Sequence, residues 1–132
     1  MSAHRGLSTY RQTQVQSRTP LELVVMLYDG ALTFLHLTRD AIERRDLHAR
    51  RDASSRALAI ISELQSTLNM TEGGEIAQRL DELYGFVNLR ILDATRDNAA
   101  APLDDAVRVL ELLRESWLSI AATSAESVRG AA

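Results

Sequence analysis

Apolar side chains recur every three or four residues along four stretches of the chain, which is the period of an amphipathic helix. The first stretch begins where Thr19 and Glu22 form a capping-box pattern around Pro20, and it runs to about Arg45. Its predicted inward face is a central stripe with three flanking residues: Leu23, Leu27, Ala31, Phe34, Thr38 and Ala41, flanked by Val24, Leu35 and Ile42.

The second and third stretches are separated by the glycine pair Gly73-Gly74, which predicts a break in helical structure. Asp46 is placed to cap a helix that runs to about Leu68. The third helix is expected from close to Glu75 to the region 96–98. The predicted inward residues are Leu47, Ser54, Ala57, Leu58, Ile61, Leu64 and Leu68 in the second helix, and Ile76, Leu80, Leu83, Val87, Ile91 and Ala94 in the third, with Tyr84 at its edge.

The fourth stretch starts at Pro102, a residue that suits the first turn of a helix, and continues to about Ser124. Its inward stripe is Leu103, Ala106, Leu110, Leu113, Trp117 and Ile120. Four helices with short connections predict an all-α, antiparallel, up-down-up-down four-helix bundle over residues 19–124. Residues 1–18 show no helical period and are expected to form a mobile N-terminal arm, and residues 125–132 a frayed tail.

Composition restricts the classes of function. The chain has 132 residues, 45% of them apolar, which suits one domain with one core. It has no cysteine, so thiol chemistry and disulfides are excluded, and its net charge of -3 disfavours nucleic acid and anionic membranes as partners. The first residues lack a signal-peptide pattern, and we expect no membrane insertion and a cytoplasmic location.

More apolar side chains are present than a four-helix core needs. Those that project away from the predicted stripes are Leu21, Val25, Tyr28, Leu32, Ile60, Phe86, Leu89, Leu92, Val109 and Leu112. They either form a contiguous groove that binds another polypeptide or are buried by tighter packing and isolated on the surface. The arm offers Leu7 and Tyr10 to cover such a groove, although Tyr10 can equally serve to anchor the arm on the bundle.

The sequence gives no pattern typical of catalysis, cofactor binding or metal binding. Its histidines, His4, His36 and His48, are far apart, and the Glu-x-x-His motif of di-iron bundles is absent. Four arginines between the first two helices, at positions 44, 45, 50 and 51, are interspersed with acidic residues, so a solvated corner is favoured over a phosphate site. We therefore predict a protein that is not an enzyme.

Three sequence blocks resemble the family of the flagellar secretion chaperone FliS. The first is Tyr10-Arg-Gln-Thr-Gln-Val15 with Thr19-Pro20, and the second is Leu27-Tyr28-Asp29-Gly30-Ala31-Leu32. The third runs from Leu68 to Ala77 and is followed by Leu80, Leu83-Tyr84 and Leu92-Asp-Ala94. Their order and separation make the likeness specific over residues 10–117.

The resemblance implies a chaperone that binds the disordered C-terminal segment of flagellin in the cytoplasm, prevents premature polymerisation and delivers it to the flagellar type III export gate. It also implies a groove-covering role for Tyr10 with Leu7. The helical pattern adds Ile60, Phe86, Leu89, Val109 and Leu112 as candidate partner-binding residues. A monomer that binds its client 1:1 is expected, and the alternative is a structural or self-dimerising helical bundle.

Overall fold

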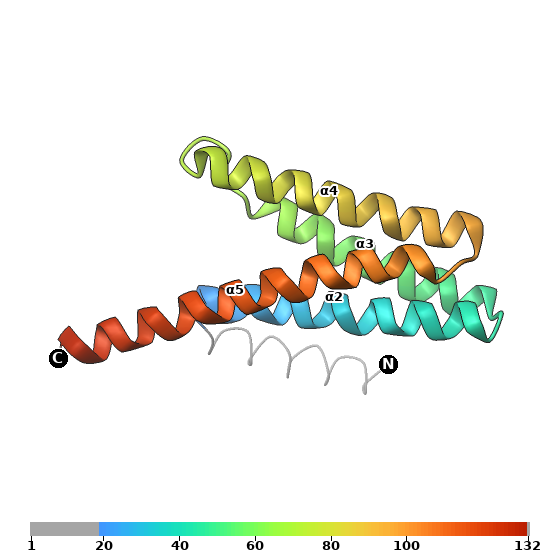
Figure 1. Ribbon diagram of the computed structural model, residues 1–132, viewed down its shortest axis with the longest axis horizontal. Helices are drawn as coiled ribbons and strands as arrows, with labels where there is room; N and C mark the ends of the chain where they lie inside the picture. The colour runs from blue at the N-terminus through green and yellow to red at the C-terminus, as the bar shows by residue number, and fades with distance from the viewer. Residues whose placement is uncertain (1–18, 132) are drawn as a thin grey trace, which may run out of the picture.

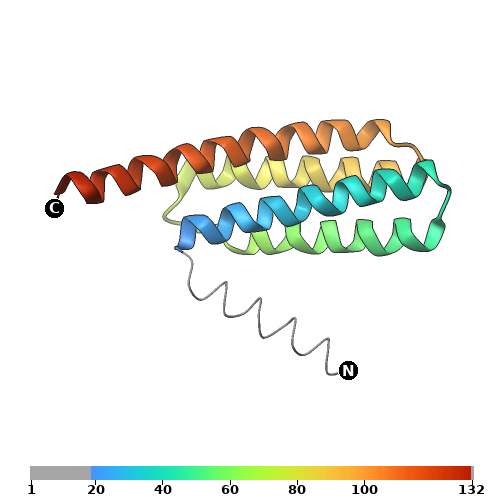
Figure 2. The same ribbon diagram turned by 90° about the horizontal axis from the view of Figure 1, so that it is seen from below.

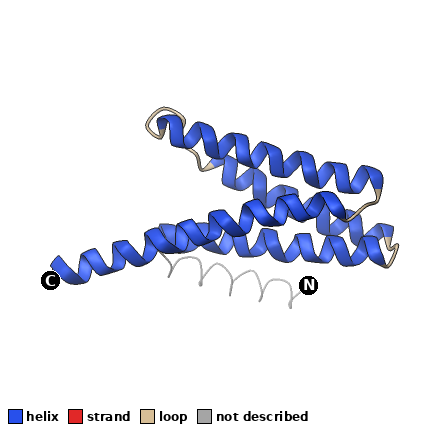
Figure 3. Ribbon diagram, in the orientation of Figure 1, coloured by secondary structure: helices blue, strands red, loops and turns tan. Residues whose placement is uncertain are grey.

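Four α-helices make up nearly all of residues 19–131, the part of the chain whose backbone the structure, a computed structural model, describes. Side chains are described for residues 19–120, 122 and 123. The helices are α2 (Pro20–Glu43), α3 (Leu47–Ser66), α4 (Gly74–Asp97) and α5 (Ala101–Ala131). The described residues contain no strand (Figure 3), so the predicted all-α class is confirmed.

The helices alternate in direction and form a ring in which each packs against its two neighbours (Figure 1). Helix α2 contacts α3 and α5, and α4 contacts the same two helices from the other side. The α2/α3 and α4/α5 seams are therefore on opposite sides of the bundle. This is the predicted antiparallel up-down-up-down bundle.

The helix boundaries follow the local signals in the sequence. The Glu22 backbone N–H donates to Thr19 Oγ1 at 3.2 Å, and the Thr19 N–H donates to the Glu22 carboxylate at 3.4 Å, which completes the capping box. Asp46 caps α3 by accepting from the Ala49 N–H at 3.0 Å. Helix α4 ends at Asn98, which takes the left-handed conformation typical of a C-terminal cap.

Helix α5 extends to Ala131, beyond the end expected near Ser124. In Figures 1 and 2 its C-terminal part projects past the ends of the other three helices. The helix continues because residues 119–129 contain neither proline nor glycine to end it. Fraying of residues 125–132 stays a prediction, and the predicted arm of residues 1–18 lies outside the described residues.

The core confirms most of the predicted stripes but corrects the rotation of α2. Tyr28 and Val25 are buried in the bundle, together with Ala31 and Leu35, although the sequence pattern placed Tyr28 and Val25 away from the predicted inward stripe. The residues expected at the centre of the core that are only partly buried are Leu23, Leu27 and Phe34. The buried arc of α2 is therefore displaced toward Tyr28, and the Leu27 side faces outward along the α3 seam.

Several residues at helix ends were also assigned wrongly to the core. Leu47, Ile76 and Ile120 are exposed, and Leu83 is exposed on the flank of α4. Leu47 and Ile76 lie in the first turns of α3 and α4, and Ile120 lies in the C-terminal part of α5. At these positions the neighbouring helices no longer cover an inward-facing side chain. Tyr84, expected at the edge of the stripe, is instead buried.

A hydrogen-bonded aromatic network crosses the core between α2, α4 and α5. The Tyr28 and Tyr84 hydroxyls lie 2.5 Å apart, and the indole N–H of Trp117 donates to the Tyr28 oxygen at 3.0 Å. Burial raises the pKa of Tyr28, and burial with the hydrogen bond to Tyr28 raises the pKa of Tyr84. Both phenols are therefore neutral in the folded protein across the physiological pH range.

Helix α2 is long and apolar enough to meet the length and composition criteria for a membrane span, which the sequence pattern had not suggested. The central helix of a helical bundle passes the same test. Here α2 packs against both α3 and α5 and carries buried residues from Val25 to Ile42. Its apolar character is accounted for by the core and by the groove described below.

Gly85 lies inside α4, where a Cβ would meet no atom within 4 Å. Because glycine costs about 0.5–1 kcal/mol relative to alanine in a helix interior, Gly85→Ala is expected to raise the free energy of unfolding by this amount. Urea unfolding followed by circular dichroism measures the change. Gly73→Ala is the matched control and should destabilise, since its Cβ would lie 2.6 Å from the Asn69 carbonyl oxygen. An unchanged Gly85→Ala protein would contradict this account.

The buried tyrosines predict a loss of stability at alkaline pH. Their pKa values are raised on folding, whereas in the unfolded chain they titrate near 10. Above about pH 10 the unfolded state therefore releases protons that the folded state keeps, and the free energy of unfolding falls by up to about 1.4 kcal/mol per pH unit for each tyrosine. Urea unfolding at pH 8–11 should show a steeper fall for the native protein than for Tyr28→Phe/Tyr84→Phe. Parallel curves would contradict the prediction.

Candidate functional site

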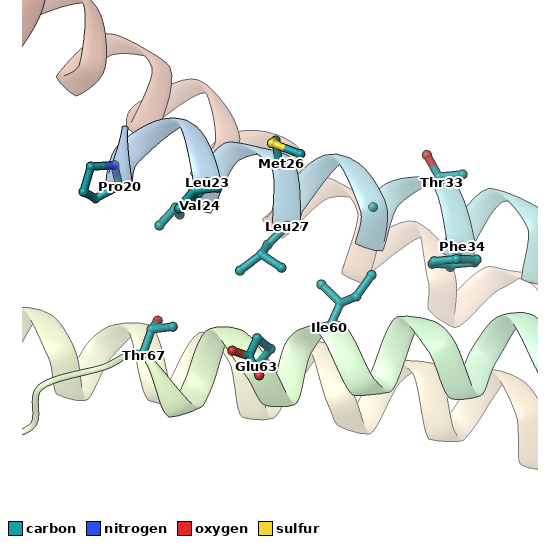
Figure 4. Close-up of a pocket in the computed structure, with 11 residues that line it drawn as sticks. Pro20, Leu23, Val24, Met26, Leu27, Thr33, Phe34, Ile60, Glu63 and Thr67 are labelled. Atoms are coloured by element: carbon teal, nitrogen blue, oxygen red, sulfur yellow. The ribbon is translucent and has the colours of Figure 1, made fainter. Parts of the chain in front are cut away.

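An apolar groove runs along the seam between α2 and α3, as shown in Figure 4. Its volume is about 860 Å³. We call it the α2/α3 groove, and it is lined by Pro20, Leu23, Val24, Met26, Leu27, Gly30, Thr33, Phe34, Ile60, Glu63 and Thr67.

Helical spacing explains why these side chains share one surface. Leu23, Leu27 and Phe34 follow one another at steps of four and seven residues on α2, and Ile60, Glu63 and Thr67 at steps of three and four on α3. The two stripes face each other across the seam in Figure 4. Val24, Leu27, Phe34 and Ile60 are partly buried and pack against the core, so the walls of the groove are held by the bundle itself.

Gly30 allows a close approach between α2 and α3 within the groove. A Cβ at this position would lie 3.1 Å from Cδ1 of Ile60, closer than most such contacts in proteins. The absence of a side chain at Gly30 therefore lets Ile60 project toward α2 from the α3 wall of the groove.

The charge pattern of the groove is simple. Glu63 is the one lining residue with an ionisable side chain. At the Phe34 end, the Arg56 guanidinium carbon lies 5.7 Å from the centre of the Phe34 ring, within the range of a cation–π contact. Arg56 also pairs with Asp52 on the preceding turn of α3, with an N–O distance of 3.2 Å. A single carboxylate and a single stacked guanidinium thus border an otherwise apolar trough.

A smaller pocket of about 320 Å³ opens at the end of the bundle and shares Pro20, Val24 and Thr67 with the groove. Its other lining residues come from all four helices and from the connection between α3 and α4: Leu21, Leu64, Leu68, Asn69, Gly73, Ile76, Ala77, Leu80, Tyr84 and Trp117. The N-terminal end of α4 and the C-terminal part of α5 spread apart at this end (Figure 1). Tyr84 and Trp117 thus connect the aromatic network to this pocket.

A second apolar surface lies on the opposite seam. Arg90 of α4 pairs with Asp105 of α5 at 3.0 Å, which identifies the flanks by which the two helices meet. Phe86 lies one turn before Arg90, and Val109 and Leu112 lie one and two turns after Asp105, so all three follow this flank in antiparallel helices. Phe86 is 42% exposed and Leu112 59%. We call these three residues the α4/α5 flank.

The candidate residues from the sequence fall in three places. Ile60 lies in the α2/α3 groove, whereas Phe86, Val109 and Leu112 form the α4/α5 flank. Leu89 is 61% exposed and lies on the outward side of α4. Leu7 and Tyr10 belong to residues outside the described part of the chain. Of the five candidates that lie in the described part of the chain, the structure therefore brings three together, on the α4/α5 flank.

The groove residues that the sequence reasoning missed are those of α2: Leu23, Leu27 and Phe34 were assigned to the core. Gly30 was the available signal, because a glycine within an apolar helical stripe indicates close approach of another element.

The described residues contain no cluster of three or more histidine or acidic side chains placed to hold a metal ion. His36 and His48 are exposed. Two of the four arginines around the turn between α2 and α3 have partners. Arg44 pairs with Asp40 at 2.9 Å and lies 3.7 Å from Asp46, and Arg50 donates to the Asn98 side chain at 2.9 Å. These partners agree with a solvated, partly neutralised corner.

Comparison with known proteins gives consistent results. The family model described as flagellar protein FliS matches residues 3–124. The flagellar secretion chaperone FliS of Salmonella typhimurium is 35% identical over 120 residues, covering 87% of this chain and 89% of the relative. The FliS of Vibrio cholerae is 31% identical over 116 residues, covering 85% of each chain.

The fold is also shared with a solved crystal structure of a flagellar chaperone from bacteria. The two chains superpose with a TM-score of 0.74 at 16% identity, covering 92% of this chain and 98% of the other. The family model and the relatives together show that this chain belongs to the FliS family of flagellar secretion chaperones.

Proposed function

We propose that this protein binds the disordered C-terminal segment of newly made flagellin in the cytoplasm, prevents its premature polymerisation and delivers it to the gate of the flagellar type III export apparatus. The observation that carries the proposal is the α2/α3 groove, which is open, apolar and about 860 Å³ in volume in a protein of a chaperone family. Such a groove is suited to the apolar face of an amphipathic helix.

Binding would be coupled to ordering of the client. A disordered segment loses conformational entropy when it becomes helical, and burial of its apolar face against side chains such as Leu27 and Ile60 offsets this loss. The surface buried in this way is then no longer free for contacts with other flagellin molecules. Sequestration and inhibition of polymerisation are therefore one event, and neither needs a cofactor.

The remaining candidate residues belong to the same proposal. Phe86, Val109 and Leu112 on the α4/α5 flank, with Leu89 beside them, would contact a further stretch of a client long enough to pass around the bundle. Tyr10 and Leu7 would cover the α2/α3 groove before the client arrives. The arm is suited to this role because it joins the bundle at Thr19, next to Pro20 at one end of the groove.

The first test is co-purification of the tagged protein with intact flagellin and with flagellin that lacks its C-terminal segment. Only the intact flagellin is expected to be retained, because the truncated form lacks the segment that fills the groove. Multi-angle light scattering should give a monomer without client and a 1:1 complex with it. Equal retention of both flagellins would contradict the proposed contact, and a stable client-free dimer would favour the self-dimerising alternative.

The second test places a charge in the groove. Ile60 is partly buried against the core and lines the groove, so Ile60→Asp leaves a carboxylate facing an apolar client surface and should weaken flagellin binding by at least about tenfold. Isothermal titration calorimetry measures the affinity, and circular dichroism checks the fold.

Leu47→Asp is the control for this test, because it also replaces a branched aliphatic side chain of α3 by aspartate, at a residue that is 55% exposed and outside the groove. Its affinity for flagellin should equal that of the native protein. Equal losses in the two variants would indicate that the groove is not the binding surface.

A further inference from the structure

The two charged groups beside the α2/α3 groove are arranged along its length. Arg56 and Glu63 are seven residues apart on α3, so they lie on the same face of the helix, about 10 Å apart along its axis. Arg56 stacks on Phe34 at one end, and Glu63 lines the half of the groove nearer Thr67 and Pro20 (Figure 4). The groove therefore has a positive group at one end and a negative group in the other half, in addition to its apolar surface.

Glu63 is available to a ligand. Within the part of the chain that the structure describes, its carboxylate forms no ion pair, although ten such pairs occur among the other side chains. A helix laid in the groove would cover this carboxylate. Covering a charge without providing a partner is costly, whereas a basic side chain on the ligand compensates for the lost hydration.

Arg56 offers the complementary charge. Asp52 engages one side of the guanidinium, at 3.2 Å from its Nε, and Phe34 lies against its face. A guanidinium has five N–H donors in a fixed fork, so donors remain for an acidic side chain of a ligand. Seven residues, or two helical turns, separate Arg56 from Glu63 on α3. When a basic residue of the ligand meets Glu63, an acidic residue two helical turns away from it on the ligand would therefore reach the Arg56 guanidinium.

We propose that Glu63 and Arg56 determine the direction in which a helical client segment lies in the α2/α3 groove. The segment has an apolar stripe, with a basic residue beside Glu63 and an acidic residue, seven positions away on the same face, beside Arg56. A segment whose basic residue precedes its acidic residue then runs parallel to α2, which passes from Pro20 near Thr67 to Phe34 near Arg56, and a segment with the reverse order runs antiparallel to α2. This inference rests on the proposed function of the groove and specifies the chemistry of what the groove accepts.

The chain provides a reporter of direction. Trp117 is its one tryptophan, and it lines the end pocket together with Pro20 and Thr67, which also form one end of the groove. Two synthetic peptides of two to four helical turns are needed, identical in their apolar stripe and carrying an N-terminal dansyl group. In one the basic residue precedes the acidic residue by seven positions, and in the other the order is reversed.

Energy transfer from Trp117 to dansyl is then measured at saturation with the full-length protein. The basic-first peptide should place its dansyl group near Trp117 and give strong transfer, whereas the acid-first peptide should bind in the opposite direction and give weak transfer. The double variant Glu63→Arg/Arg56→Glu should exchange the two results. Arg108→Glu/Glu111→Arg, the same exchange at two exposed residues of α5, should leave them unchanged.

Affinity gives a second readout. Glu63→Gln should weaken binding of the basic-first peptide by about 3- to 10-fold, the range expected for one ion pair at a partly covered site, and Glu111→Gln should not. Equal transfer from both peptides, or no exchange in the double variant, would overturn the proposed role of Glu63 and Arg56 while leaving the groove as a binding site. If neither peptide binds, or if Ile60→Asp does not weaken binding, the groove itself fails as the client site and this inference fails with it.

Discussion

Helix α2 carries apolar side chains around more of its circumference than its neighbours cover, and the groove is a consequence of this excess. Successive residues of a helix differ by about 100° in direction, so Leu27 and Tyr28 cannot both point into one core. Burial of Tyr28 beneath Tyr84 and Trp117 turns the Leu27 side toward the α3 seam. There α3 meets it with Ile60 but fills only part of the space, since α3 presents Glu63 and Thr67 over the remaining length.

The walls of the groove are partly core residues, which has consequences for binding. Val24, Leu27, Phe34 and Ile60 pack against the buried cluster on one side and face the open groove on the other. Their rotamers are therefore restrained before any client arrives, so the chaperone loses little conformational entropy on binding. The cost of ordering falls mainly on the client, which makes the affinity depend on how well the client's apolar stripe matches a preformed surface.

The sequence was sufficient to predict the fold because the deciding signals are local. Thr19 and Glu22, Asp46, and the glycine pair at 73 and 74 act within one turn of a helix boundary, and the predicted boundaries agree with the structure to within a few residues, except at the end of α5. The rotation of α2 was not predictable in the same way. Both the Leu27 stripe and the Tyr28 stripe have helical period. Only the contacts of Tyr28 with Tyr84 and Trp117, which are distant in the sequence, select between them.

The aromatic network makes that selection specific, which an apolar contact would not do. A Phe at either tyrosine position would fill a similar volume, but it would tolerate rotation of α2 or a one-turn slip of α5, since apolar surfaces have no preferred partner atom. In this protein such a shift separates Trp117 Nε1, Tyr28 Oη and Tyr84 Oη and leaves polar groups unpaired in apolar surroundings, at about 1–3 kcal/mol each. Because Leu27 adjoins Tyr28 in the chain, the hydrogen bonds that hold Tyr28 in the core also determine which way the groove wall faces. A buried polar contact on one side of α2 thus specifies an apolar binding surface on the other.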